Sequence, residues 1–448
     1  MTDSLVELAD YPSRTLYTTW NLSFAQIDQQ SPHAAHLLRF LAYLDHQDIW
    51  FQLLGKGLGV NQPAWFTAIA GDEFAFEDAM HVLTQYCLVE AHHQTGTYSL
   101  HTCVHDWTLN GLNQQIDEVQ YWLAFDCVAR HISWDDWDYL WAVQYQRFTG
   151  HVMRLLHDRF EAAATQIESV RTRFNSIGRL SRLLMEQVHY YSAVQMYTRL
   201  LEGQEEALGP DHISTLDTFN CLGILYHRQG KLVQAEKMFI QALQGQEEAL
   251  GPDHTSTLDT LNNLGTLYGE QGKLVEAEKI FIQALRGKAK ELGPDHTSTL
   301  NTISNLGILY RRQGKLIEAE KMFIQALQGY EKALGPDHTL TLRMVNQLGI
   351  LYRRQDKLVE AEKMFIQALQ GYEKAVGAER MPLHPPALNA MIYYGHIYSQ
   401  TNRKQLAKEM YTRALSGYTA IQGPSSKVCS QLEADLQALQ LPASSGPD

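Results

Sequence analysis

Aspartate and histidine stand side by side four times in this sequence, in the tetrapeptide Gly-Pro-Asp-His that begins at Gly209, Gly251, Gly293 and Gly335. An Asp-His pair could ligate a metal ion or exchange protons with a substrate. The copies are, however, evenly spread along the chain, one in each unit of a repeat. Packed helices lie about 10 Å from one another, whereas a zinc–ligand bond is about 2 Å long. We therefore interpret the pairs as residues that shape loops and cap helices, and we predict no metal site.

Two further histidines, His101 and His105, have the four-residue spacing at which one helix presents half of a zinc site. Thr102 stands where the helical zinc motif of metalloproteases requires a glutamate, so metal-assisted hydrolysis is not indicated. Neither a cysteine nucleophile nor a Ser-His-Asp arrangement has a recognisable local signature. These observations predict a protein that is not an enzyme and that needs no cofactor.

Arginine pairs at 311–312 and 353–354 form the remaining group with binding chemistry. A guanidinium binds a carboxylate through two parallel hydrogen bonds, so the pairs could recognise an acidic ligand. Each pair also precedes Gln-Gly or Gln-Asp, where arginine complements the carbonyl groups at a helix end. A carboxylate-binding surface and a solvated helix face both remain open on this pattern.

The elements that carry these residues recur at a fixed interval, from Gly209 to Gly251 and onward, and an interval of this size is typical of a helical solenoid. In one unit Leu264, Gly265 and Tyr268 lie on one side of a first helix, and Ala277 and Phe281 line a second helix. The small residues allow the two helices to approach closely, and the phenylalanine fills the space that they leave. The predicted array has four regular units, a fifth with extra residues around Met381–Leu383, a worn initial unit with Ala193, Tyr197 and Leu201, and a capping helix at Lys427–Leu439.

Residues 1–110 follow another pattern. Ser31-Pro32 predicts a helix cap followed by the first helical residue. An apolar stripe that includes Phe74 and Met80 predicts a second helix, and Cys87–Glu90 and Thr97–Leu100 predict the strands of a hairpin. A further helix is expected to begin at His101. Helices, a hairpin and a final helix indicate a winged-helix-like module.

Charge and tryptophan content both change between residues 145 and 175. The net charge of −13 lies within residues 1–161, which hold 20 acidic and 7 basic residues, and all eight tryptophans fall between Trp20 and Trp141. We therefore predict a nearly all-α chain in three parts: the winged-helix-like module at 1–110, a helical linker at 111–174, and an α-solenoid of about six helix pairs at 175–448.

Composition also excludes several classes of partner. The acidic N-terminal part argues against nucleic acid, because neutralisation of phosphates dominates that affinity. No apolar stretch reaches about 18 residues, so no membrane span or membrane partner is expected. Five scattered cysteines form no disulfide framework, and we predict a cytoplasmic protein.

From about residue 175 to 440 the units resemble tetratricopeptide repeats, whose L-G-x2-Y…A-x3-F-x2-A core is present four times nearly intact. The spacing of the units and segments such as Thr257–Leu264 resemble the kinesin-light-chain subtype, although Phe219, Leu261, Ile303 or Val345 replaces the usual early tryptophan. The resemblance implies a concave face of first helices that binds a protein partner. The partner-binding residues expected on that face are Asn220, Asn262, Asn301, Ile308, Arg311, Arg312, Arg343, Asn346, Ile350, Arg353, Arg354 and Asn389.

The chemistry of those residues suggests the ligand. Arginines would bind carboxylates, asparagines would pair with an extended peptide backbone, and isoleucines would contact an apolar anchor. We therefore expect an acidic peptide with one or two large apolar side chains, the kind of ligand that kinesin light chains bind. The segment Ser133–Tyr139 (Ser-Trp-Asp-Asp-Trp-Asp-Tyr) fits this description. It is either an internal pseudo-ligand or a helix with its tryptophans in the core.

Residues 8–110 resemble the module that follows the nucleotide-binding domain in fungal STAND proteins, which are NACHT or NB-ARC proteins similar in plan to NOD-like receptors. The resemblance lies in Thr18–Phe24, Ala34–Leu38 and Tyr98–Val104. It implies a nucleotide-sensing role for His101, which matches the histidine of the family's Met-His-Asp motif, with Thr102 in place of the aspartate.

No G-x4-G-K-[ST] phosphate loop occurs in the sequence. We therefore expect the effector-sensing half of a STAND-type protein without its nucleotide-binding domain. The alternatives are a kinesin-light-chain-like cargo adaptor and a nucleotide-dependent switch whose NTPase domain is supplied separately. Against the adaptor stands the lack of a long N-terminal heptad coiled coil.

Overall fold

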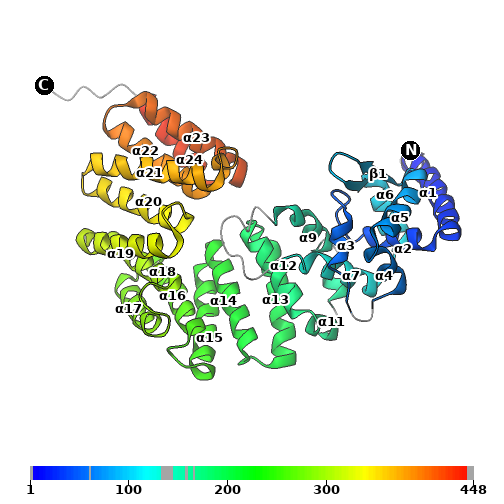
Figure 1. Ribbon diagram of the computed structural model, residues 1–448, viewed down its shortest axis with the longest axis horizontal. Coiled ribbons are helices and arrows are strands. Elements are labelled where there is room, and N and C mark those ends of the chain that lie inside the picture. The colour runs from blue at the N-terminus through cyan, green and yellow to red at the C-terminus, as the bar shows by residue number, and fades with distance from the viewer. Residues whose placement is uncertain (1–3, 60–61, 133–144, 157–159, 165–166, 441–448) are drawn as a thin grey trace. The chain divides into compact units, whose positions relative to one another are not determined.

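The computed structural model describes residues 4–59, 62–132, 145–156, 160–164 and 167–440. The segment Ser133–Tyr139 lies outside them. The contacts divide the chain into two compact units, Met1–Gln229 and Gly230–Asp448. Helices dominate both units, and one two-stranded sheet accompanies them in the described residues (Figure 1). The prediction of a nearly all-α fold is confirmed, and the domain limits at 110 and 174 stay predictions.

The N-terminal unit begins with short helices around one hairpin. Ser31 caps the second helix, where its side chain accepts a hydrogen bond from the backbone N–H of Ala34, and Pro32 follows as predicted. In chain order the elements are α1 (Ser4–Gln30), α2 (Pro32–Leu41), α3 (Phe51–Gly55), α4 (Ala64–Ala70), α5 (Glu73–Gln85), β1 (Val89–His92), β2 (Thr97–Leu100), α6 (Thr102–Trp107), a π-helical turn (Thr108–Leu112) and α7 (Glu118–Ala129).

The hairpin differs from its prediction by two residues. Strand β1 begins at Val89 because Cys87, at φ 57°, and the following residue close the end of α5 with their backbone amides. Phe74, predicted on the buried stripe, is 78% exposed. It precedes the buried Phe76 by two residues and so lies about 200° from it around the helix. The winged-helix-like arrangement itself stays a prediction.

The rest of the N-terminal unit is helical and ends in the first helix pairs of the repeat array. Helix α12 packs against α13, and α13 packs against α14. The worn initial unit predicted around Tyr197 is therefore an actual helix pair, α12 with α13. The elements are a 3-10 turn (Gln146–Phe148), α9 (Thr149–Leu156), α10 (Phe160–Ala163), α11 (Ile167–Arg171), α12 (Phe174–Glu186), α13 (Tyr190–Leu208) and α14 (Ile213–Arg228).

The C-terminal unit consists of alternating second and first helices of the repeats (Figure 1). The extra residues of the fifth unit form a 3-10 turn at Met381–Leu383, and the predicted capping helix is present as α24. In order the helices are α15 (Leu232–Ala249), α16 (Thr255–Glu270), α17 (Leu274–Glu291), α18 (Thr297–Arg312), α19 (Leu316–Leu334), α20 (Thr339–Arg354), α21 (Leu358–Val376), α22 (Pro385–Gln400), α23 (Lys404–Gln422) and α24 (Lys427–Gln440).

Histidines of the Gly-Pro-Asp-His loops begin the first helices. Nδ1 of His254, His296 and His338 each accepts a hydrogen bond of 3.2 Å from the backbone N–H two residues later. This is the bond that a helix N-cap supplies to an otherwise unpaired N–H. In each loop a threonine hydroxyl also donates to the glycine carbonyl, as Thr299 does to Gly293 at 2.8 Å. The structure therefore confirms that these histidines cap helices.

The core of each repeat depends on a close approach between its two helices. Phe323 of α19 is fully buried and packs against α18 at Gly307, where a Cβ atom would lie 2.8 Å from its ring. Leu300 fills the opposite notch at Gly329, where a Cβ atom would lie 2.4 Å from its methyl group. Because neither contact leaves room for a side chain, the predicted small residues are what set the helix spacing.

Similar ion pairs recur along the repeats. Each joins a second helix to the turn between the two helices of the following repeat. Glu278 of α17 accepts hydrogen bonds from Gln313 at 3.0 Å and from Lys315 at 2.9 Å, and Glu236 and Glu320 have the equivalent partners. In the last step Glu362 accepts two hydrogen bonds from the Arg403 guanidinium, at 2.8 and 2.7 Å. These bonds connect residues about one repeat apart.

Acid is expected to weaken the pair between Glu362 and Arg403. Its hydrogen bonds outweigh the opposing effect of burial and, with the charge of Arg403, lower the pKa of Glu362 below the ordinary 4.5. A carboxylate with a lowered folded-state pKa adds stability above its unfolded pKa and loses it as the pH falls through the folded value. Thermal denaturation should show wild type more stable than Glu362→Gln at neutral pH, with the difference shrinking below about pH 4.5. A constant difference down to about pH 3 would contradict this assignment.

Candidate functional site

Neighbouring first helices of the C-terminal unit contact each other through their side chains. Asn305 of α18 donates a hydrogen bond of 3.2 Å to Asn262 of α16. The guanidinium of Arg353 on α20 lies 5.7 Å from the centre of the Tyr393 ring on α22. Helices α16, α18, α20, α22 and α24 thus form one layer, and we call its exposed side the first-helix surface.

The two arginine pairs lie at the ends of adjacent helices on this surface. Arg311 and Arg312 end α18, and Arg353 and Arg354 end α20. In each pair the first side chain is half-buried and the second is exposed. Arg354 donates a hydrogen bond of 3.3 Å to the carbonyl of Arg311. It therefore complements a carbonyl group at the end of α18, as predicted if the arginines stabilise helix ends.

The positive charges of the four arginines repel one another. Burial first, and then the positive charges of Arg354, Arg312 and Arg353, lower the pKa of Arg311 below its ordinary value, although Tyr393 opposes the shift. Within the described ranges, none of the four forms an ion pair with a carboxylate. A negative ligand at this position would therefore relieve repulsion as well as add hydrogen bonds.

Asn301 and Arg343, both predicted to bind the partner, are engaged with each other. Oδ1 of Asn301 accepts hydrogen bonds from Arg343 at 2.9 Å and from the Tyr330 hydroxyl at 2.7 Å. Tyr330 is fully buried on α19, so this network ties α18 and α20 to a second helix. Both residues are half-buried, and this network uses part of their hydrogen-bonding capacity.

The remaining predicted residues differ in accessibility. Asn346 and Ile350 are only 5% and 4% exposed. Asn262 and Ile308 are half-buried, and Asn389 is exposed on α22. Asn220 lies on α14 of the N-terminal unit. Arg311, Arg312, Arg353 and Arg354 are therefore the predicted residues that the structure gathers into one accessible cluster.

A small cavity of about 140 Å³ opens on the first-helix surface between α16 and α18. Gly265, Gly269, Phe281, Ile308 and Leu309 form much of its wall. Thr266, Glu270, Asn305 and Arg312 supply its polar edge. Apolar groups thus lie beside Arg312 of the arginine cluster and beside one carboxylate, that of Glu270.

Models of the tetratricopeptide repeat match residues 172–239, 214–290, 261–332 and 298–374, and a second such model matches 389–416. This part of the chain is a tetratricopeptide-repeat domain. The matches begin just before the solenoid boundary predicted at 175. Residues 25–116 match a domain of unknown function (DUF7779). No curated protein matches the sequence.

Several solved structures are similar to parts of this chain, among them the following three. BtubC (BKLC) from P. vanneervenii is 18% identical, with 58% of this chain and 95% of that chain covered and a TM-score of 0.41. A candidate kinesin light chain from Podosopora anserina with nearly identical TPR-like repeats is 24% identical, with coverage of 47% and 98% and a TM-score of 0.39. A STAND protein with a tetratricopeptide repeat sensor from Pyrococcus horikoshii is 13% identical, with coverage of 93% and 64% and a TM-score of 0.44. Because all three scores are below 0.5, none of these proteins bears on what this chain binds.

Two residues of the first-helix surface, Tyr393 and Asp435, lie outside the repeat positions that predicted the others. Tyr393 of α22 contacts Arg353, and Asp435 of α24 lies 3.3 Å from His396 of α22. His396 itself is at a repeat position of the fifth unit once the extra residues around Met381–Leu383 are allowed for. Burial above all, with the charge of Arg353, lowers the pKa of His396. Asp435 could not be found in this way, because α24 carries no repeat core.

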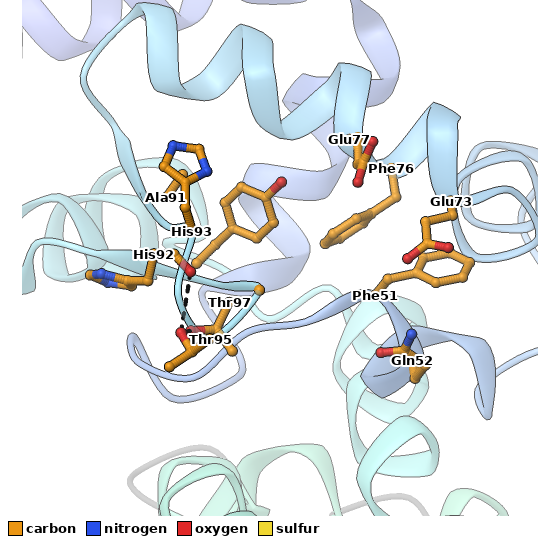
Figure 2. Close-up of a pocket in the computed structure, with 12 residues that line it drawn as sticks. Phe51, Gln52, Glu73, Phe76, Glu77, Ala91, His92, His93, Thr95 and Thr97 are labelled. Carbon is orange, nitrogen blue, oxygen red and sulfur yellow. Dashed lines mark hydrogen bonds between the residues drawn. The ribbon is translucent and has the colours of Figure 1, made fainter.

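A second hollow, of about 390 Å³, lies beside the hairpin of the N-terminal unit (Figure 2). Glu73 and Glu77 of α5 stand on one side of it, and His92 and Thr95 of the hairpin stand on the other. His92 already shares a hydrogen bond of 2.7 Å with Ser99, and Thr95 shares one of 2.8 Å with Thr97. The side chains on the hairpin side are therefore satisfied locally and do not converge on a ligand.

His101, the candidate nucleotide sensor, occupies the N-cap of α6 and accepts a hydrogen bond of 3.3 Å from the backbone N–H of Cys103. It thus does for α6 what the loop histidines do for the tetratricopeptide helices. His105 is buried, bonds to the carbonyl of Leu44, and has a pKa lowered to about 4, mainly by burial. Among the described residues no group of three or more His, Cys, Asp or Glu side chains is placed to hold a metal ion. The nucleotide-sensing role stays a prediction.

No described helix combines the length and the apolar character that crossing a bilayer requires.

Proposed function

We propose that this tetratricopeptide-repeat chain is a non-enzymatic interaction protein that binds an acidic peptide on its first-helix surface. The observation that carries the proposal is the arginine cluster, Arg311, Arg312, Arg353 and Arg354. These four cations lie on two adjacent helices, and none has a carboxylate partner among the residues described. Tetratricopeptide repeats are protein-interaction scaffolds, and in this fold the first helices are the layer that meets the partner.

The energetics favour a carboxylate ligand at this place. Arginines that end helices are ordinarily stabilised by the carbonyl dipoles, by about 0.3–1 kcal/mol each. That gain accounts for Arg354, which touches a carbonyl, but not for the half-buried Arg311 and Arg353, whose Nε atoms are buried without a hydrogen-bond partner in the described structure. A buried donor without a partner costs about 1–3 kcal/mol. A carboxylate bound to the accessible part of these guanidinium groups would offset this cost through new charge-assisted hydrogen bonds.

The finer assignment is part of the same proposal. We infer that the partner-binding array serves as the sensing half of a STAND-type protein, on the motif positions in residues 8–110. A nucleotide-dependent switch would instead bind ADP or ATP, alone or with a separate NTPase chain, whereas the sensing role alone needs no nucleotide. Isothermal titration of the chain with ADP and ATP separates these two functions.

The decisive experiment reverses the charge of the cluster in the full chain. We expect Arg311→Glu, Arg312→Glu, Arg353→Glu and Arg354→Glu together to abolish capture of acidic partners from cell extract, as read by quantitative mass spectrometry. Loss of several charge-assisted hydrogen bonds, each worth about 1.5–3 kcal/mol, should weaken binding by at least about 100-fold.

The second helices offer a matched control. Lys237, Lys279, Lys321 and Lys363 occupy one exposed position in four successive units, so their reversal to glutamate changes the net charge by the same amount. We expect this control to keep the partners that the cluster variant loses. Equal loss from both variants would show a general charge effect, and equal capture by wild type and the cluster variant would refute the proposed function.

A further inference from the structure

Near its C-terminal end, helix α16 departs from its sister helices at three positions of the first-helix surface. At one of them Glu270 replaces Arg312 and Arg354, and at the other two the side chain is smaller. Thr266 stands where α18 and α20 carry Ile308 and Ile350, and Gly269 stands where they carry Arg311 and Arg353. Thr266 and Gly269 are one helical turn apart, so the volume that their small side chains leave is concentrated at one place.

The cavity of about 140 Å³ lies where those side chains are missing. It is close in size to the ~150 Å³ cavity that accepts benzene in an engineered protein core. Phe281, Ile308 and Leu309 give it an apolar wall, and Arg312 and Glu270 both lie at its edge. The space therefore suits one phenyl ring or one branched aliphatic side chain. An acidic residue of the same ligand would lie toward Arg312 and the arginines of α20, away from the Glu270 carboxylate.

The cavity is not needed for packing of the helices. A Cβ atom on Gly269 would lie 3.5 Å from Leu309 and 3.9 Å from Arg312, which is ordinary contact. This contrasts with Gly307, where a Cβ atom would lie 2.8 Å from Phe323. Gly269 therefore leaves space without being required by a close helix approach.

We propose that this cavity is the side-chain pocket of the peptide site, and that it takes a single phenyl or branched aliphatic side chain. The proposal rests on the proposed function. It adds the register of the ligand, that is, the spacing between its apolar residue and its acidic residues. The pocket lies between α16 and α18, and Arg353 and Arg354 lie on the next helix of the layer, about 10 Å further on. An extended peptide advances about 3.3 Å per residue, so its acidic residues should lie about three positions from the apolar one.

Selection from a random peptide library on phage tests this register with the full chain. Peptides enriched on wild type should share acidic residues about three positions from one Phe, Leu or Ile. Gly269→Arg, which installs the residue used by two sister helices, should fill the pocket. The variant should still select acidic peptides but lose the apolar preference. Wild-type peptides should bind it about 10- to 100-fold more weakly, the effect of leaving one apolar side chain exposed.

The added charge makes the outcome easy to interpret. Gly269→Arg increases positive charge, so weaker binding of an acidic peptide cannot come from electrostatics. Gln283→Arg, at an exposed position of α17, adds the same charge away from the surface and should bind like wild type. Thr266→Ile narrows the same pocket with a side chain that sister helices already carry, and should reproduce the loss.

Failure of the pocket is distinguishable from failure of the proposed function. If acidic peptides are selected and depend on the four arginines, but bind Gly269→Arg and Thr266→Ile as tightly as wild type, the pocket assignment is wrong and the function stands. If selected peptides are not acidic, or bind the four-glutamate variant equally well, both are wrong. A shared apolar residue at no fixed distance from the acidic ones would overturn the register.

Discussion

Phe323→Ala is expected to lower the local free energy of unfolding of α18–α20 by about 3–5 kcal/mol. Phe323 is fully buried and lies in a cluster with Leu300, Ile303 and Leu348, which come from α18 and α20. Its ring fills most of the notch at Gly307, beside Cβ of Met322. The truncation therefore leaves a cavity, and the cavity adds to the lost burial of the ring.

Amide hydrogen exchange read by mass spectrometry measures this effect, because it reports local unfolding helix by helix. In a repeat array each unit contacts its neighbours, so protection should fall in α18–α20 first. Ile324→Ala provides the matched control, since Ile324 is the next residue and is 36% exposed. Similar losses for both variants would show that Phe323 is not the centre of this core.

Gly417→Ala should destabilise α22 and α23 by about 3 kcal/mol, the upper part of the range for overpacking. A Cβ atom at this position would lie 2.3 Å from the backbone carbonyl oxygen of Pro382 and 2.7 Å from the methyl groups of Leu388. The leucine can move, but the carbonyl belongs to the 3-10 turn at Met381–Leu383. Relief of the clash therefore requires the inserted segment itself to shift.

The same substitution at Gly269 is the control for Gly417→Ala. There the added methyl group makes ordinary contact, and alanine is favoured over glycine inside a helix by about 0.5–1 kcal/mol. We expect Gly269→Ala to be neutral or slightly stabilising, while Gly417→Ala lowers the midpoint of thermal denaturation by several degrees. A Gly417→Ala protein with unchanged protection in α22 and α23 would refute the close packing at the inserted turn.

The regular part of the fold could be predicted because the residues that specify each helix pair lie within one repeat. A helix pair is specified by apolar residues spaced three or four apart, by a glycine at the turn and by a histidine before the next helix, all within one contiguous repeat. The first strand was predicted two residues early, because the backbone amides of Cys87 and Leu88 close the end of α5 before the strand begins. Phe74 was placed on the buried stripe, although it lies about 200° from Phe76 around the helix.

The arginine cluster was predictable as a pattern, because the pairs recur at the same place on a helix of known periodicity. Which members of the wider predicted set reach the surface was not. Asn301, Arg343 and Tyr330 come from three helices and find each other only in the folded array, where one hydrogen-bond network holds all three. Asn346 and Ile350 occupy the same repeat positions as the half-buried Asn262 and Ile308, yet they are buried.

The sequence by itself thus determined the repeat, its helix pairs, the capping role of the loop histidines and the presence of paired arginines, because each depends on neighbours within one turn or one repeat. Only the tertiary structure decided which arginines lack a carboxylate partner among the described residues and which polar residues pair with one another. It also decided where the small residues Thr266 and Gly269 leave a pocket. Exposure, pairing and empty volume depend on residues a whole repeat away, and packing between helices sets them.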